Sequence, residues 1–218
     1  MYAARPAGKR GRAAPRYTFQ MQTQHADIRV IAANDYQRVR WKNGLGWTRE
    51  IARFPDNEAW IWRLSIAEIE RDAVFSRFPG VDRELVLLSG NGLRLRFESG
   101  EVRELMPPHA STRSEGEAAV TGELTDGPTT DFNLMWRRDA VDAQLWHRPM
   151  VGAMVVFIDP GETWVVHMLA GHAGFDGRDD GVHLQAGDTA LLQATDLRRR
   201  CVLEGAGEAL LIRLRMRT

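Results

Sequence analysis

Apolar and polar residues alternate along much of this chain, which is the pattern of β-strands with one buried face. In residues 60–69, one face carries Trp60, Trp62, Leu64 and Ile66 and the other carries Ile61, Arg63, Ser65 and Ala67. Residues 93–98 alternate in the same way, and further strands are expected at 131–138, 151–159, 162–169, 188–193 and 208–216. Residues 34–40 predict at most a short helix. The pattern therefore predicts an all-β chain.

Turn residues divide this pattern into units. The Asn91-Gly92 pair lies between two strand-like runs and predicts a hairpin, because both residues tolerate positive φ. The stretch 84–92 (ELVLLSGNG) weakly resembles 164–172 (WVVHMLAGH), and the small and polar residues of 107–130 predict a connection between two similar β units. We therefore expect a pair of small barrels.

Length and composition agree with a globular protein. The chain has 218 residues, 44% of them hydrophobic and 27% charged, with a formal net charge of +0. No apolar run approaches the roughly 20 residues of a membrane span. The first 20 residues are basic, and without them the remainder is slightly acidic, which argues against nucleic-acid binding. The single cysteine, Cys201, and the lack of an export signal predict a reducing cytoplasm.

Local motifs for metal binding or nucleophilic catalysis are not found. The six histidines include no H-x-H pair, and no G-x-S-x-G elbow or glycine-rich phosphate loop occurs. Cys201 is expected to be a packing residue. We therefore predict no catalytic residue, no metal and no cofactor.

Arginine, lysine and amide side chains are the candidates for a ligand-binding site. The chain contains 27 arginines and two lysines, Lys9 and Lys42, and Lys42 stands in the segment 40–54 (RWKNGLGWTREIARF). Such a lysine is either solvated or part of an anion site. Arg63 either faces solvent or points into a barrel, where its planar fork would suit a carboxylate. The neighbouring Asp82 and Arg83 are interpreted as a local salt bridge that organises a turn.

Three segments resemble the HutD/Ves family of the cupin superfamily, in order and spacing. They are WKNGLGWTREIARFP, the long stretch from WIWRLSIAEI to SGNGLRL, and DGPTTDFNLMWRRD. The resemblance implies a bicupin, which is two cupin-type (RmlC-like) β-barrels in one chain. It also implies a cytoplasmic protein that senses an acidic metabolite of the formyl- or formimino-glutamate type and modulates histidine utilisation or a stress response. Leu45 departs from the family's W-K-N-G-G-G, where the middle glycine would tolerate positive φ.

The resulting hypothesis places a carboxylate site in the first barrel. Arg63 clamps the carboxylate, and Lys42 and Arg49 add positive potential. The other expected ligand-binding residues supply hydrogen bonds or an apolar wall: Asn43, Thr48, Ser65, Asn133, Trp41 and Trp47. The alternatives are a metal-independent cupin enzyme of the isomerase, epimerase or lyase type, and a scaffold for a regulatory protein partner.

The expected domain organisation has three parts. Residues 1–24 form a basic, disordered extension, which is either a flexible arm or residues translated upstream of a start at Met21. Residues 25–115 form the first barrel and 116–218 the second, and the two barrels can exchange strands. A small carboxylate metabolite is the expected partner, with no nucleic acid and no membrane; a second copy of the chain is a further candidate.

Overall fold

The computed structural model describes residues 26–41, 44–176 and 183–217. Within these ranges the chain is built of β-strands and one short 3-10 helix, η1 (Ala33–Asp35), so the expected all-β class is confirmed. The strands are β1 (Asp27–Ile31), β2 (Gln37–Arg40), β3 (Gly46–Phe54), β4 (Trp62–Ile69), β5 (Ala73–Val74), β6 (Val81–Ser89), β7 (Leu93–Phe97), β8 (Val102–Leu105), β9 (Ser111–Glu115), β10 (Val120–Leu124), β11 (Thr129–Arg137), β12 (Val141–Ile158), β13 (Glu162–Phe175), β14 (His183–Gln185), β15 (Thr189–Gln193) and β16 (Arg199–Met216). None of the described ranges contains a helix that could cross a membrane.

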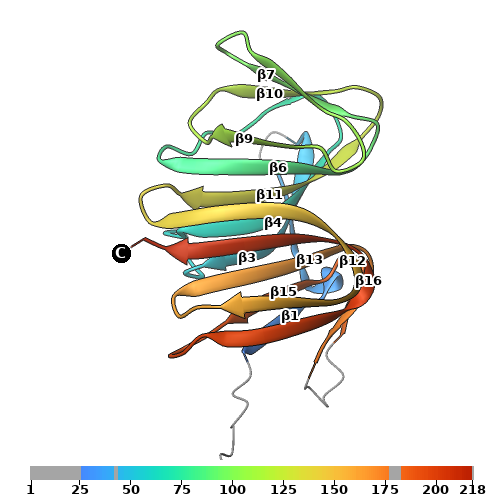
Figure 1. The fold of residues 1–218 in the computed structure, drawn as a ribbon. Helices are drawn as coiled ribbons and strands as arrows, with labels where there is room; N and C mark the ends of the chain where they lie inside the picture. The colour runs from blue at the N-terminus through green and yellow to red at the C-terminus, as the bar shows by residue number, and fades with distance from the viewer. Residues whose placement is uncertain (1–25, 42–43, 177–182, 218) are drawn as a thin grey trace, which may run out of the picture.

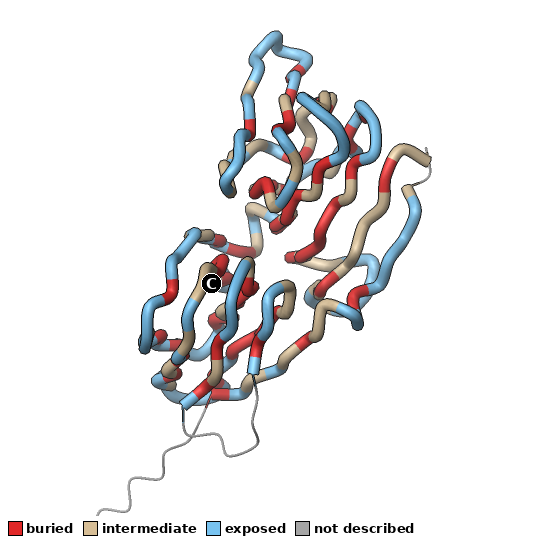
Figure 2. The backbone as a smooth tube through the Cα atoms, turned by 90° about the vertical axis from the view of Figure 1, so that its right-hand side faces the viewer, coloured by how far each residue is buried: buried red, intermediate tan, exposed pale blue. Residues whose placement is uncertain are grey.

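The strands form three sheets (Figure 1). The central sheet has the order β2-β3-β4-β11-β6-β9, and the small sheet has the order β5-β10-β7-β8. The C-terminal sheet has the order β1-β15-β13-β16-β12, with β14 paired to β13. All three orders are open, so no closed barrel is found among the described strands. In Figure 2 the backbone forms two lobes, and buried and exposed segments alternate along it.

The two faces of the central sheet are buried against different partners. The face carrying Leu64, Phe132 and Trp136 packs against apolar side chains of the C-terminal sheet, among them Val165 and Ile212. This arrangement confirms the predicted alternation in β4, because Trp62, Leu64 and Ile66 all belong to that core.

The opposite face of the central sheet meets the small sheet. Leu85 and Leu87 of β6 pack with Leu93 and Leu95 of β7 in a second apolar cluster. A third cluster, which includes Ile158, Val166 and Leu203, is built around the C-terminal sheet, to which β1 also contributes. Because Arg63 lies between Trp62 and Leu64 in β4, its side chain emerges on the face turned toward the small sheet.

Two local predictions are wrong. The runs on either side of Asn91-Gly92 do not form a hairpin, because β6 pairs with β9 and β11 whereas β7 pairs with β8 and β10. The Asn-Gly turn therefore carries the chain from one sheet to another. The segment 107–130 is also not a simple connection, since it contains β9 and β10, which pair with β6 and β7. Local turn chemistry does not reveal which strand becomes the partner.

Candidate functional site

A cavity of about 400 Å³ lies on the small-sheet side of the central sheet. Its floor consists of cross-strand neighbours, because residues paired in register point to the same face. One row joins Ala67 of β4 to Asp131 of β11, and the next joins Ser65 to Asn133. A third row runs from Arg63 through Met135 to Arg83. Strand β5 and the segment after it contribute Val74, Phe75, Ser76 and Phe78, and the other lining residues are Arg40, Trp41, Thr48 and Leu85.

Arg63 is held at this cavity by an ion pair. Its Nε lies 2.6 Å from Oε2 of Glu50, and the other oxygen of Glu50 lies 3.3 Å from Nε of Arg53. The Arg63 side chain is 21% exposed, so it is neither stretched into solvent nor sealed in the core. The hydrogen bond to Glu50 is donated by Nε of Arg63, and the Arg63 side chain also borders the cavity. Arg63 is therefore paired with an internal acid and still has space beside it.

Arg83 and Asp131 place a second charge pair in the cavity wall. Burial lowers the pKa of Arg83 to about 10 against the opposing effect of Asp131, which leaves the guanidinium charged at neutral pH. Burial raises the pKa of Asp131 to about 7, although the charge of Arg83 works in the other direction. The charge of Arg63 also lowers the pKa of Arg83, so the two guanidinium groups repel each other. An anion between them would relieve that repulsion.

Several polar atoms of this wall are buried without a hydrogen-bond partner among the described residues. They are Nε of Arg83, both carboxyl oxygens of Asp131 and Oδ1 of Asn133. Leaving such an atom unpaired costs about 1–3 kcal/mol, so buried polar groups normally have partners. All three of these side chains border the same cavity, and a bound molecule that offers both donors and acceptors would satisfy them.

Aromatic side chains reduce the access of water to these groups. The ring of Trp41 meets Phe75 edge-on at 6.5 Å between centroids, and its Nε1 donates a 2.9 Å hydrogen bond to Oγ1 of Thr48. The guanidinium carbon of Arg83 lies 5.5 Å from the ring centroid of Phe75 and 5.6 Å from that of Phe78. Low local polarity strengthens any charged contact made inside the cavity.

Five residues of the sequence-based hypothesis border the cavity, namely Trp41, Thr48, Arg63, Ser65 and Asn133. Lys42 and Asn43 lie outside the described residues. In the same segment Gly44 has a φ of 72°, whereas Leu45 has no positive φ. The departure from the family pattern at Leu45 therefore causes no backbone strain.

Arg49 and Trp47 do not border the cavity. Arg49 pairs with Glu68, with 2.8 Å between Nε and Oε1. Trp47 lies against Arg38, whose guanidinium carbon is 4.1 Å from the ring centroid, and donates from Nε1 to Glu70. The reason is the period of a strand: residues 47 and 49 point to the opposite face from Thr48. Grouping consecutive strand residues in one site disregarded this alternation.

Sequence reasoning missed Arg83 and Asp131. The predicted salt bridge between Asp82 and Arg83 is wrong, because Asp82 pairs with Arg113 and Arg138 while Arg83 lies in the cavity wall. The signal was present in the alternation of β6, since Arg83 shares its face with Leu85 and Leu87. An arginine at a core position of a strand is a candidate for a ligand contact.

The arrangement of strands in these sheets matches a solved HutD structure, so the protein has a cupin-like fold. The HutD family model matches residues 33–211. The chain belongs to the HutD family, as its three sequence segments indicated.

Individual relatives agree with this assignment. HutD from Pseudomonas fluorescens SBW25, solved in a formate condition, has 30% sequence identity and a TM-score of 0.77, covering 88% of this chain and 100% of that one. An uncharacterised 21.2 kDa protein in the hutC 3′ region of Pseudomonas putida is 38% identical over 55% of this chain and 64% of its own length. Protein Ves of Cronobacter sakazakii is 42% identical over 48% of this chain and 58% of its own length. The chain thus spans less than two thirds of these two curated relatives.

Proposed function

We propose that this protein binds a small acidic metabolite in the cavity between the central and small sheets. The observation that supports this proposal is the set of unpaired buried polar atoms on Arg83, Asp131 and Asn133, beside the guanidinium of Arg63. Nε of Arg83 lacks an acceptor, and the guanidinium of Arg63 borders the same cavity, so a carboxylate bound there would contact both cations. Asp131 and the Oδ1 of Asn133 require a donor, which an N–H group supplies.

A cavity that needs both an acceptor and a donor from its ligand restricts the class of molecule that it can bind. The molecule carries at least one carboxylate and an amide or amidine N–H a few bonds away, as do N-formylglutamate and formiminoglutamate. A cavity of about 400 Å³ accommodates a molecule of that size. Two or three charged hydrogen bonds give an affinity in the micromolar to millimolar range after ordering costs. That range suits a sensor of metabolite concentration.

The proposal for the biological role rests on the family rather than on the cavity. Because one relative is encoded in a hutC 3′ region, we propose that the bound metabolite belongs to histidine degradation and that the protein modulates that pathway in the cytoplasm. A stress response is the alternative, and a regulatory protein or a second copy of the chain is a further partner. We also propose that the chain is a bicupin with units at 25–115 and 116–218. In that arrangement β1 would be exchanged into the second unit and β10 and β11 into the first, consistent with their pairing to β15, β7 and β6.

One observation favours an enzyme as the second candidate. Asp131 is a buried carboxyl group in a cavity wall, and burial raises its pKa to about 7. A group that titrates near neutrality is suited to general acid–base catalysis. An isomerase, epimerase or lyase that acts on the same carboxylate would use Asp131 as its proton carrier.

Calorimetric titration of the full chain with N-formylglutamate and formiminoglutamate tests the proposal. The matched control is the diamide of N-formylglutamate, which keeps the size and the N–H groups but has no carboxylate. We expect binding of the acids and at least a tenfold weaker interaction with the diamide, because a charged hydrogen bond contributes about 1.5–3 kcal/mol. Equal binding of acid and diamide, or no heat with either acid at 10 mM, a level near the weak end of a millimolar site, contradicts it.

NMR spectra of the same samples, recorded over a day, separate the sensor from the enzyme. A sensor returns the ligand unchanged. New resonances that depend on Asp131 would establish turnover.

A further inference from the structure

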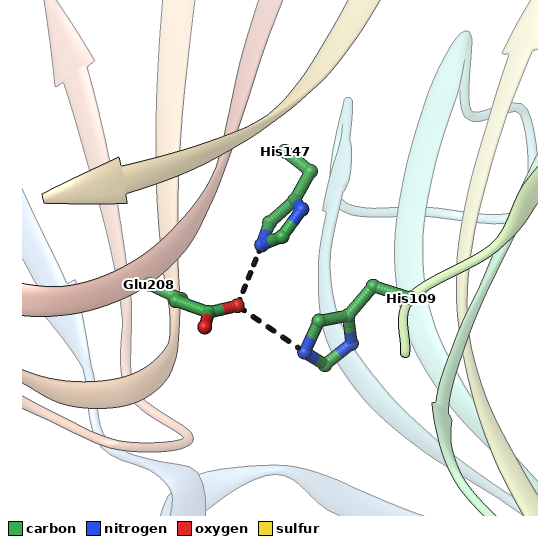
Figure 3. Close-up of side chains that lie close together, drawn as sticks. All are labelled: His109, His147 and Glu208. Carbon is green, nitrogen blue, oxygen red and sulfur yellow. Dashed lines mark hydrogen bonds and ion pairs between the residues drawn. The ribbon is translucent and has the colours of Figure 1, made fainter. Parts of the chain in front are cut away.

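His109, His147 and Glu208 converge from three separate parts of the chain (Figure 3). His109 follows β8, His147 lies in β12 and Glu208 lies in β16. Nε2 of His147 is 2.7 Å from Oε2 of Glu208, and Nε2 of His109 is 3.5 Å from the same oxygen. The candidate ligand atoms all lie within 4.8 Å of one another, and none of the three residues borders the cavity described above.

Strand register brings two of these side chains together. In the antiparallel pair of β12 and β16, His147 is opposite Leu210 and Glu208 is opposite Pro149. His147 and Glu208 are therefore diagonal neighbours on one face, a spacing that long side chains bridge. Both are partly exposed, His147 by 38% and Glu208 by 43%, so their side chains can adjust to a ligand.

The backbone of His109 is held in an unusual conformation. Its φ is 54°, which makes it the one non-glycine residue with positive φ in the described ranges. Such a conformation costs of order 1–3 kcal/mol, and it persists where the surroundings impose it. The ring of His109 lies 5.0 Å from that of His147, between centroids. The strained position thus presents an imidazole from the first half of the chain to a carboxylate of the C-terminal sheet.

The hydrogen bonds of His109 determine which nitrogen faces Glu208. Nδ1 is 3.2 Å from the carbonyl oxygen of Leu87, and a carbonyl only accepts, so Nδ1 carries the proton. In the neutral ring, Nε2 then directs its lone pair toward the Glu208 carboxylate. Two acceptors that face each other repel, and either a proton on Nε2 of His109 or a metal ion bound by both groups removes that repulsion. A backbone carbonyl that holds Nδ1–H is also the arrangement that supports metal-binding histidines.

We propose that His109, His147 and Glu208 bind a divalent transition metal, with Zn²⁺ as the expected ion. Two imidazoles and a carboxylate form a common three-residue zinc set, which leaves a fourth position for water or a ligand. Zinc bonds of about 2.0–2.2 Å place tetrahedral ligand atoms roughly 3.4 Å apart. The separations of 2.7 and 3.5 Å from Glu208, and of at most 4.8 Å between any two ligand atoms, approach that arrangement, so side-chain movements of about 1–2 Å suffice, the size of the difference from roughly 3.4 Å. The ion would connect the segment after β8 to the C-terminal sheet.

Equilibrium titration of the tag-free full chain with Zn²⁺ alone, in competition with a chromophoric chelator, measures the affinity. We expect one ion per chain, and at least a tenfold loss of affinity in His147→Ala and in Glu208→Gln. His183→Ala is the matched control, because His183 is an exposed histidine of β14 outside the cluster, and it should bind as the wild type does. Thermal unfolding without metal shows whether each variant folds.

Nitrogen-15 NMR of the histidine side chains in the wild-type protein keeps the proposal testable if a variant does not fold. Zn²⁺ should shift Nε2 of His109 and of His147 and leave Nδ1 of His109 protonated. The proposal is overturned if no ion binds below about 100 μM, a weak limit for a built site. It is equally overturned if both folded variants retain wild-type affinity, or if the shifted nitrogens belong to other histidines. The last two outcomes would leave the cluster as a hydrogen-bonded contact between the two halves.

Discussion

The buried carboxyl group of Asp131 makes the stability of the protein depend on pH. Its pKa rises from an ordinary 3.8 to about 7 in the folded protein, chiefly because burial disfavours the charge. Folding therefore favours the protonated form. The stability contributed by this group is complete below pH 3.8 and is lost progressively as the pH rises to about 7.

The size of the effect follows from the two pKa values. The difference of 7 − 3.8, about 3 units, corresponds to a loss of about 4 kcal/mol, at 1.36 kcal/mol per unit. Asp131→Asn has nearly the same shape but does not titrate. The free energy of unfolding of the variant, minus that of the wild type, should therefore increase by about 4 kcal/mol between pH 4 and pH 8. Groups that titrate in both proteins cancel in this difference.

Urea unfolding followed by tryptophan fluorescence, at intervals from pH 4 to pH 8, measures this difference. Asp35→Asn is the matched control, because its side chain is exposed on η1, and its difference from the wild type should stay nearly constant. If the difference in unfolding free energy between Asp131→Asn and the wild type stays constant within about 1 kcal/mol over this range, the reasoning is refuted. The pKa shift of Asp131 alone requires a change of about 4 kcal/mol. A constant difference would mean that Asp131 is ionised and well solvated.

Three further substitutions test the packing and hydrogen bonds of the core between the central and C-terminal sheets. Leu64→Ala should lower the free energy of unfolding by about 2–5 kcal/mol, because Leu64 is fully buried between the central and C-terminal sheets. Val151→Ala is the exposed control, and it should change the free energy of unfolding by no more than about 0.5 kcal/mol, because Val151 is 93% exposed. If urea unfolding shows equal losses of stability for Leu64→Ala and Val151→Ala, the assigned core is wrong. Tyr36→Phe should lower the free energy of unfolding by about 1–3 kcal/mol. The hydroxyl of Tyr36 donates a hydrogen bond to the carbonyl oxygen of Gly187 at 2.6 Å and shares another with Oγ1 of Thr189 at 2.7 Å. A urea midpoint equal to that of the wild type would show that these bonds do not contribute to stability.

Period-two alternation was sufficient to predict the fold class and part of the site. In β4 it separated Leu64, which is in the core, from Arg63 and Ser65, which border the cavity. The same rule applied to β6 would have found Arg83, but the neighbouring Asp82 suggested a local ion pair instead. Consistent use of the strand period would also have removed Arg49 from the site. The errors came from reading adjacent residues as partners.

Long-range pairing set the limit of what the sequence could predict. The turn at Asn91-Gly92 has the chemistry of a hairpin, yet its two strands join different sheets because each finds a distant partner. The cluster of His109, His147 and Glu208 is likewise invisible to spacing rules, since its last two members are 61 residues apart. Local motifs such as H-x-H report ligands on one strand, whereas these ligands come from three segments of the fold.

The central claim is that Arg63 receives the carboxylate of an acidic ligand in this cavity. Calorimetric titration of Arg63→Ala and Arg53→Ala with N-formylglutamate tests it most directly. Both arginines pair with Glu50, but only Arg63 borders the cavity, so Arg53→Ala controls for the loss of that ion pair. With both variants shown to be folded by circular dichroism, Arg63→Ala should bind at least about tenfold more weakly, and Arg53→Ala within about twofold of the wild type. Undiminished binding by Arg63→Ala, or an equal loss in both variants, would contradict the account.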